Sequence, residues 1–280
     1  MNKKMSVKKL RHRAEMPLLT LCIVLTVAIW SLLLYVVLVE HASPAEWTFP
    51  IIFGAAAPFI LLLYSFKRTY WKTVVNAVEL TDKQFPEVYE LYVRIAKDMG
   101  FGSGKGAMSN IPRLYMTDGS GTLNAFASKC QVHKGYVCIN SDLLEIAYSH
   151  NDLSGIGFVL AHELGHIKCG HVSAWRTIAH PMANLIGLGQ SLTRAQEWTV
   201  DRCAYYYAPE GKESMMVLIA GKHLYKQVDM EEYFRTVHNH KGGLWLKLEN
   251  YLSDHAVGYR RMEAIKETAE KGWDVHGKML

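Results

Sequence analysis

A run of uncharged, mostly apolar residues near the start of the chain constrains the fold more than any other feature. Residues 17–39, PLLTLCIVLTVAIWSLLLYVVLV, contain no Asp, Glu, Lys or Arg over 23 positions. As an α-helix this run would be about 35 Å long, enough to cross a bilayer with some tilt. A second uncharged run at residues 49–66, FPIIFGAAAPFILLLYSF, would be about 27 Å long. We therefore expect a two-helix transmembrane hairpin at residues 17–66.

The basic residues that flank the two runs predict the orientation of this hairpin. Residues 1–16 contain six Lys or Arg side chains, residues 67–72 contain three, and the segment between the runs contains none. Because basic residues favour the cytoplasmic side, both ends are expected there. A cleaved signal peptide is the alternative for the first run, but the run exceeds the apolar core of about 7–15 residues that such peptides have, and a second span follows.

The predicted organisation has three parts. A basic cytoplasmic tail occupies residues 1–16, the hairpin residues 17–66, and a cytoplasmic domain residues 67–280. The chain is thus expected to be an integral protein of the cell inner membrane with both termini in the cytoplasm. The net charge of the chain is +5, and residues 1–16 alone contribute six positive charges and one negative. The remainder is neutral overall, so nucleic acid is not an expected partner.

The region after residue 72 predicts a mostly α domain with a small β-sheet. Thr81 and Gln84 have the spacing of a capping box at the start of a helix that ends near Gly100. The glycine-rich stretch at 100–110 lacks the spacing of a phosphate-binding loop and is read as a connector. Short strands are expected at 112–118, 123–129 and 135–140, and helices at 141–150, 152–171, 193–208, 211–227, 229–239 and 256–271.

The stretch GFVLAHELGHIKCGH, residues 157–171, contains a His-Glu-x-x-His motif. His162 and His166 are four residues apart and share one face of a helix, with Glu163 beside them. This is the arrangement of two ligands and a general base in zinc peptidases. The alternative is a pair of hydrogen-bonded core histidines. The apolar neighbours predict a buried helix, where each imidazole needs a partner, and this favours a metal.

Zinc requires a third protein ligand, and His171 is the first candidate. The metzincin pattern needs Gly three residues and His six residues after the second His, but Cys169 and Val172 occupy those positions. His171 is therefore read as a residue at the helix end. Cys169 itself has three readings, metal ligand, redox sensor and packed apolar residue, of which packing is favoured. The five cysteines, none spaced as Cys-x-x-Cys, are typical of free thiols in a reducing compartment.

The second candidate lies in TRAQEWTVDRCA, residues 193–204. Glu197 and Asp201 are four residues apart on one helix face. Glu197 can bind the metal, while Asp201 accepts an N–H from a ligand imidazole and orients it. The alternative is a solvated pair of carboxylates.

Together these segments resemble the HtpX-like and CAAX-prenyl-protease-like zinc metallopeptidases. VLAHELGHIKCGH and TRAQEWTVD are similar to that family's His-Glu-x-x-His and Ser-Arg-x-x-Glu-x-x-Ala-Asp motifs. TLNAFASK at 122–129 resembles its Asn-Ala-Phe-Ala strand, and SDHAVGYRRM at 253–262 its C-terminal His-Pro and Arg segment. The resemblance covers roughly residues 75–270. The departures are Thr193 in place of Ser, Val200 in place of Ala, and Ala256 in place of Pro.

The resemblance implies an α+β zincin-type metallopeptidase domain of the gluzincin class, which is a hydrolase, preceded by the transmembrane hairpin. One Zn²⁺ per chain is the implied cofactor. Protein or peptide substrates, including misfolded membrane proteins, and the lipid bilayer are the implied partners. The implied site residues are catalytic Glu163 and His255, metal ligands His162, His166 and Glu197, supporting Asp201 and Arg261, and substrate-binding Asn124, Ala125 and Phe126.

Alternatives stay open for several of these assignments. The strand at 123–129 is equally well read as an ordinary sheet edge. The apolar piece at 178–189 is expected to be a loop near the membrane, with a re-entrant segment as the alternative. A membrane protease for quality control or processing is expected; a protease specific for prenylated C-termini and a catalytically silent zinc-binding membrane scaffold are the rivals. The intact Glu163 argues against the scaffold, which has no need for a general base.

Overall fold

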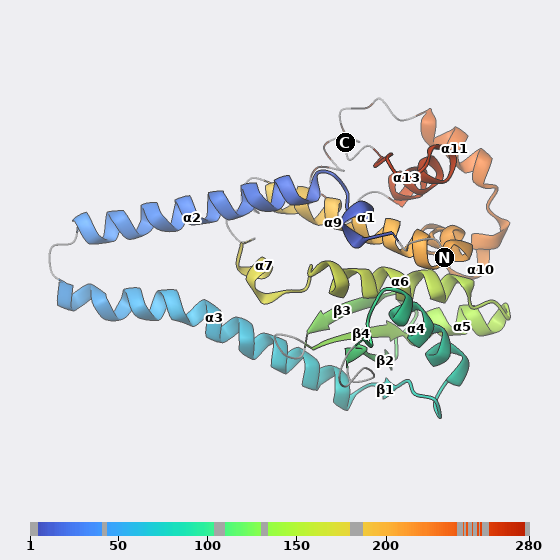
Figure 1. Ribbon diagram of the computed structural model, residues 1–280, viewed down its shortest axis with the longest axis horizontal. Helices are drawn as coiled ribbons and strands as arrows, with labels where there is room; N and C mark the ends of the chain where they lie inside the picture. Colours follow the sequence, from blue (N-terminus) through green and yellow to red (C-terminus); the bar gives the residue numbers. More distant parts are fainter. Residues whose placement is uncertain are drawn as a thin grey trace.

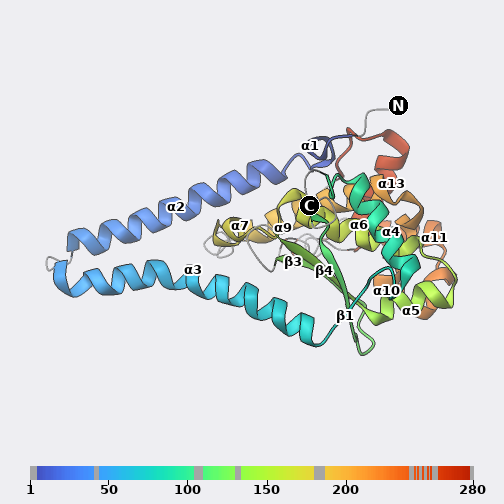
Figure 2. The same cartoon turned by 60° about the horizontal axis from the view of Figure 1, so that its bottom comes forward.

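The computed structural model describes residues 5–40, 44–103, 110–129, 134–179, 187–239 and 258–277, together with the single residues 243, 245, 248, 251 and 253. The chain is mostly helical with a small mixed sheet, as the pattern of residues predicts. Two long helices, α2 (Glu15–Glu40) and α3 (Pro44–Val75), project in the same direction away from the remaining elements (Figure 1). A view turned by 60° shows the same projection (Figure 2).

The helix α2 contains the longest apolar stretch of the structure. Its part Glu15–Val36 is long and apolar enough to cross a membrane, and it is the one such candidate among the described residues. The helix α3 extends past the second predicted span through Lys67, Arg68 and Lys72 to Val75. The structure therefore contains one possible membrane-spanning helix by length and composition, and the two-span hairpin stays a prediction.

The sheet has four strands in the order β1-β2-β4-β3. The strands are β1 (Val78–Glu79), β2 (Arg113–Thr117), β3 (Ala125–Lys129) and β4 (Gly135–Asn140). β2 and β4 pair in parallel, while β1 and β3 pair antiparallel to their neighbours. The central strand β4 is buried from Tyr136 to Ile139, as expected for a strand covered on both faces. β3 is thus the edge strand on one side of the described sheet.

The helix α6 (Ser154–Cys169), which contains the His-Glu-x-x-His motif, lies between the sheet and α9 (Leu188–Tyr207) (Figure 1). The two helices approach closely because α6 has a glycine at their crossing. A Cβ atom at Gly165 would lie 3.1 Å from Cγ1 of Val200. The helix α4 (Pro86–Asp98) packs against another part of α6. The motif is therefore held in the core of the domain by neighbours on several faces.

The segment before α2 is also packed into this core. It contains the short helix α1 (Val7–Leu10), and both α1 and the first part of α2 contact α9. Leu10, His12 and Glu15 are buried. Arg202 on α9 donates a hydrogen bond from Nε to the carbonyl oxygen of Leu10 at 2.9 Å. The predicted basic tail therefore includes residues that belong to the core of the domain.

Two local predictions are corrected by the structure. The helix predicted from Thr81 begins instead at Pro86, whose ring favours the first helical position; Thr81 and Gln84 form a tight turn before it. The single helix predicted at 211–227 is wrong. That region contains the 3₁₀ helix η2 (Pro209–Met216), the helix α10 (Val217–Leu224) with a break at Gly221, and the 3₁₀ helix η3 (Tyr225–Gln227). Gly221 has a φ of 74°, and this left-handed backbone angle interrupts an α-helix.

The remaining described elements complete the helical part of the domain. α9 begins at Leu188, several residues before the predicted start at 193, because Gly187 adopts a left-handed conformation there. Cys22, Cys138, Cys169 and Cys203 are free and buried, while Cys130 lies outside the described residues. The other helices are α5 (Ser141–Ser149), α7 (Ala174–Ala179), α11 (Met230–His238) and α13 (Gly258–Lys271).

Candidate metal centre

Two helices bring together three potential metal ligands. α6 contributes His162 and His166 from one of its faces, and α9 contributes Glu197. Nε2 of His162 lies 3.3 Å from Nε2 of His166 and 3.5 Å from Oε2 of Glu197. Nε2 of His166 lies 3.3 Å from Oε1 of Glu197. The three side chains are only 6–16% exposed, so the cluster is shielded but reachable.

The spacing of these donor atoms fits a tetrahedral cation. Zinc binds imidazole nitrogens and carboxylate oxygens at about 2.1 Å, so two ligand atoms on a tetrahedral zinc ion lie about 3.4 Å apart. The two imidazole nitrogens here lie 3.3 Å apart, and each lies 3.3–3.5 Å from one of the two carboxylate oxygens of Glu197. Two nitrogens and one oxygen are also the donor set of a catalytic zinc site that leaves one position for water. Both the chemistry and the spacing of these residues therefore fit zinc.

Asp201 and Arg261 support the first histidine of the cluster. Nδ1 of His162 donates a hydrogen bond to Oδ1 of Asp201 at 2.9 Å. Arg261, on α13, donates from Nε and Nη2 to the two oxygens of Asp201, at 2.7 Å each. Nη2 of Arg261 also lies 3.4 Å from Oε2 of Glu197. This arrangement leaves Nε2 of His162 facing the other two ligands.

The charged side chains of His162, Asp201 and Arg261 shift one another's pKa values because they are buried close together. Burial lowers the pKa of His162, but Asp201 and Glu197 outweigh it and raise that pKa to about 10. Burial also opposes ionisation of Asp201, whose pKa is nevertheless lowered by Arg261 and His162. The pKa of Arg261 is raised by the same carboxylates against the effect of burial. Asp201 is therefore anionic, and its charge would help to stabilise a cation bound to His162.

The second histidine has a different set of neighbours. Nδ1 of His166 lies 3.1 Å from Nδ1 of His171, and Nε2 of His171 lies 3.1 Å from Oε1 of Glu15. The side chains of His171 and Glu15 are 2% and 0% exposed. Burial lowers the pKa of His171 to about 4. His171 is therefore neutral at pH 7 and touches a candidate ligand, although it is not itself one of the three donors.

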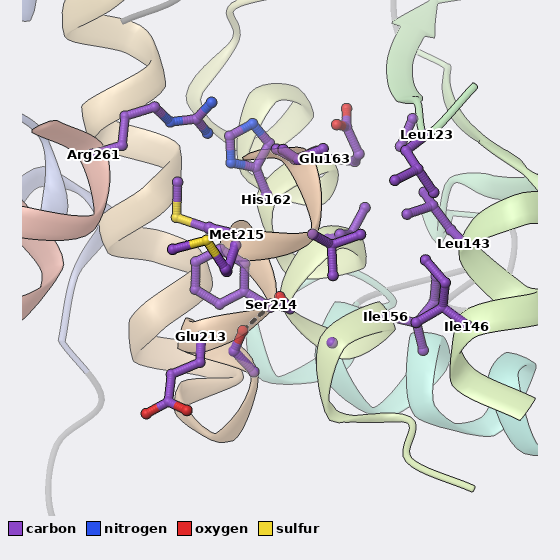
Figure 3. A pocket seen from close by; sticks show the side chains of 18 of the residues that line it. Leu123, Leu143, Ile146, Ile156, His162, Glu163, Glu213, Ser214, Met215 and Arg261 are labelled. Atoms are coloured by element: carbon purple, nitrogen blue, oxygen red, sulfur yellow. Dashed lines mark hydrogen bonds between the residues drawn. The ribbon is translucent and has the colours of Figure 1, made fainter. Parts of the chain in front are cut away.

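A cavity of about 1120 Å³ opens beside the cluster. His162, Glu163, His166 and Glu197 line one part of it. In Figure 3 the carboxylate of Glu163 projects into the space between His162 and Leu123, while Arg261 points toward His162 from the opposite side. The far part is lined by apolar side chains that include Leu143, Ile146 and Ile156 (Figure 3). The cavity therefore combines a polar floor with an apolar end.

The edge strand β3 forms another wall of this cavity. Asn124, Ala125 and Phe126 all line it. The register pairs Ala125 with Ile139 and Phe126 with Cys138 of β4, so β4 occupies one edge of β3. The ring of Phe126 also packs edge to face on Tyr136, with 6.1 Å between the centroids. The other edge of β3 has no strand partner in the described sheet, and Phe126 serves the packing of the sheet as well.

Some residues with an expected role are not part of the described metal cluster. His255 lies outside the described residues, as does most of the segment 178–189. Cys169 is buried next to Cys203 of α9, and its pKa is lowered chiefly by a hydrogen bond with that thiol. Among the described residues the candidate metal cluster consists of His162, His166 and Glu197, without Cys169. The packing interpretation of Cys169 therefore fits its position.

Sequence reasoning missed the contact between His166 and His171 and the part that Glu15 has in it. The signal available was weak: His171 follows His166 by five residues, just after the C-terminal turn of α6, where Gly170 has a φ of 77°. Glu15 is the one acidic residue among the first 16 residues. Its partner His171 is 156 residues away along the chain, and no local pattern reports such a contact.

Comparison with known proteins supports the reading of this centre. Residues 82–180 match the profile of Peptidase family M48. The chain is also 26% identical over 163 residues to the Plastoglobule-localized metallopeptidase 48, chloroplastic, of Arabidopsis thaliana; the match covers 53% of this chain and 43% of the relative. The chain thus spans less than half the length of that relative. No solved structure matches the chain. The matched residues include the His-Glu-x-x-His helix, so this part of the chain is similar to Peptidase family M48 and to a protein named as a metallopeptidase.

Proposed function

We propose that this chain is a membrane-anchored zinc metalloendopeptidase. The observation that carries the proposal is the pair of imidazole nitrogens 3.3 Å apart, each 3.3–3.5 Å from a carboxylate oxygen of Glu197, beside Glu163 at the floor of a cavity. A bound zinc ion would supply Lewis-acid chemistry, polarising the scissile carbonyl and making water more acidic. His162, His166 and Glu197 would hold it.

The residues of the chain divide the remaining work of peptide hydrolysis. Glu163 lines the cavity next to the ligands and would accept the proton of the attacking water and pass it to the leaving amine. Asp201, held by two hydrogen bonds from Arg261, keeps the proton of His162 on Nδ1 so that Nε2 stays available as a ligand. His255 stays a proposed donor to the oxyanion, on the resemblance alone.

The shape of the cavity supports an extended peptide as the substrate. Its backbone would pair with the open edge of β3 at Asn124, Ala125 and Phe126, where main-chain hydrogen bonds give affinity. The apolar end at Leu143, Ile146 and Ile156 would accept an apolar side chain. Because α2 projects from the same domain, membrane proteins in quality control or processing are the proposed substrates.

Removal of the metal is expected to abolish peptide hydrolysis reversibly. Full-length protein purified in detergent should contain one zinc ion per chain by elemental analysis and should cleave fluorescently labelled casein. Dialysis against 1,10-phenanthroline should reduce cleavage to the background rate, because no residue of the site replaces a Lewis acid. Stoichiometric zinc should restore it, whereas magnesium should not, since it prefers six oxygen ligands. Unchanged cleavage by zinc-depleted protein would refute the proposed function.

The membrane anchor predicts where each part of the chain lies. In a bacterial host, alkaline phosphatase fused after Leu280 should be inactive, and green fluorescent protein at the same place should fluoresce, because both expected spans return the chain to the cytoplasm. Phosphatase inserted after residue 42 should be active, which provides the matched control. An active phosphatase after Leu280 would contradict the two-span topology, leaving the proposed chemistry untouched.

A further inference from the structure

The structure assigns His171 and Glu15 to the metal centre as positioning residues: together they hold His166 with its Nε2 available as a ligand. This inference rests on the proposed function, because it assumes that His166 binds a metal. It adds a part of the chain that the His-Glu-x-x-His motif does not contain. This part, the foot of α2, consists of Glu15 at the start of α2 and the four residues before it, and it precedes the apolar stretch.

The hydrogen bonds have one consistent direction. Nε2 of His166 faces His162 and Glu197, each 3.3 Å away, so the proton of a metal-binding His166 lies on Nδ1. That Nδ1 can donate to Nδ1 of His171 at 3.1 Å. His171 then has its own proton on Nε2 and donates it to Oε1 of Glu15, also at 3.1 Å. Nδ1 of His166 and both nitrogens of His171 thus each have one hydrogen-bond partner, and reversing either bond would place a proton on the metal-facing Nε2 of His166.

Glu15 is a fixed acceptor at the end of this chain of hydrogen bonds. Its carboxylate is fully buried and accepts from Thr199 of α9 at 2.6 Å and from Arg176 of α7 at 3.2 Å. Arg11 forms an ion pair with it from one turn earlier. A buried carboxylate with this many donors has little freedom to move. Glu15 can therefore fix the orientation of the His171 ring.

The two ligand histidines consequently have parallel supports. His162 donates to Asp201, which is fixed by Arg261. His166 donates through His171 to Glu15, which is fixed by arginines and a threonine. The second support differs in origin, because Glu15 is the first residue of α2. The geometry of the metal centre thus depends on where the foot of α2 is seated in the domain.

Two substitutions at one position test this role of His171. His171→Phe keeps the ring volume but removes the acceptor for His166, while Glu15 retains Arg11, Arg176 and Thr199. His171→Asn restores an acceptor oxygen at the place of Nδ1. Supporting residues of this kind typically contribute about 10–100-fold to metal affinity. We expect His171→Phe to weaken zinc binding by about that factor and His171→Asn to recover most of the loss. Competition with a chromophoric chelator measures the zinc dissociation constant of the full-length protein.

The unfolding temperature of zinc-depleted protein distinguishes a positioning role of His171 from a role in the general stability of the fold. A purely structural role would lower that temperature in both variants and weaken zinc binding equally in both, which would overturn the inference. Wild-type zinc affinity in His171→Phe would overturn it as well. Should that variant not fold, Glu15→Gln gives a second measurement. It should weaken zinc binding by about tenfold, whereas the exposed Glu90→Gln control should not, and equal affinity in both would refute the role of Glu15.

The same titrations distinguish this inference from the proposed function. If the wild-type chain binds no zinc, both the proposed function and this inference are wrong. If the wild type binds zinc and His171→Phe binds it equally well, only this inference is wrong.

Discussion

Glu163→Gln is expected to abolish peptide hydrolysis while the chain still binds one zinc ion. Glu163 lines the cavity beside the candidate ligands but is not among the three donor atoms. Gln has nearly the same shape and no basic oxygen, so it cannot accept the proton of the attacking water. General bases contribute about 10²–10⁴-fold to rate, and kcat should fall by that factor. The measurement is cleavage of labelled casein at saturating substrate, with elemental analysis of the same sample.

A second glutamate of the cavity provides the matched control. Glu213 lines the same cavity and in Figure 3 lies apart from His162 and Arg261. Glu213→Gln removes the same charge from the cavity and should leave kcat near the wild-type value. If Glu163→Gln cleaves at the wild-type rate with its zinc in place, Glu163 is not the general base and the proposed mechanism is wrong.

Glu197→Gln is expected to remove most of the zinc and, with it, the activity. The carboxylate is the third donor and the one anionic ligand of the described cluster. An amide oxygen is a weaker ligand than a carboxylate oxygen. The substitution also removes the negative charge that lies 3.4 Å from Nη2 of Arg261. Zinc affinity should therefore fall by more than the ~100-fold upper range that supporting residues show. Chelator competition measures the change.

The zinc affinities of two Glu197 variants show whether Glu197 binds the metal or only lies next to it. Glu197→Asp retains the charge on a shorter side chain and should bind zinc between the wild type and Glu197→Gln, because the oxygen withdraws from the two Nε2 atoms. Full zinc stoichiometry and unchanged affinity in Glu197→Gln would mean that another side chain completes the site. The general-base experiment on Glu163 would keep its meaning in that case.

Local sequence patterns predict the strands and helices whose apolar residues follow a regular spacing or a continuous run. The buried run 135–140 forms β4, and the run 113–117 forms β2, because apolar and β-branched residues bounded by turns form strands. The helix around His162 is predicted from 152 and observed from Ser154. The four-residue spacing of His162 and His166, and of Glu197 and Asp201, is by itself enough to place each pair on one helix face.

The predictions that failed depended on less local information. A strand of two residues, Val78–Glu79, has no periodicity to detect; it exists because it pairs with β2. The region 211–227 has a helical composition, but the chain there turns around the cavity in short 3₁₀ and α segments with a break at Gly221. Capping chemistry at Thr81 is real, yet Pro86 decides where the helix begins.

The sequence alone determined the chemistry available to this protein. Helical spacing presents two imidazoles together and two carboxylates together, since residues four apart share a face. Only the tertiary structure decided that Glu197 meets His162 and His166 at 3.3–3.5 Å, and that Glu15 reaches His171 across 156 residues. Such contacts depend on how α6, α9 and the foot of α2 pack, including the close approach at Gly165. Packing is a property of many distant residues at once, so no short motif contains it.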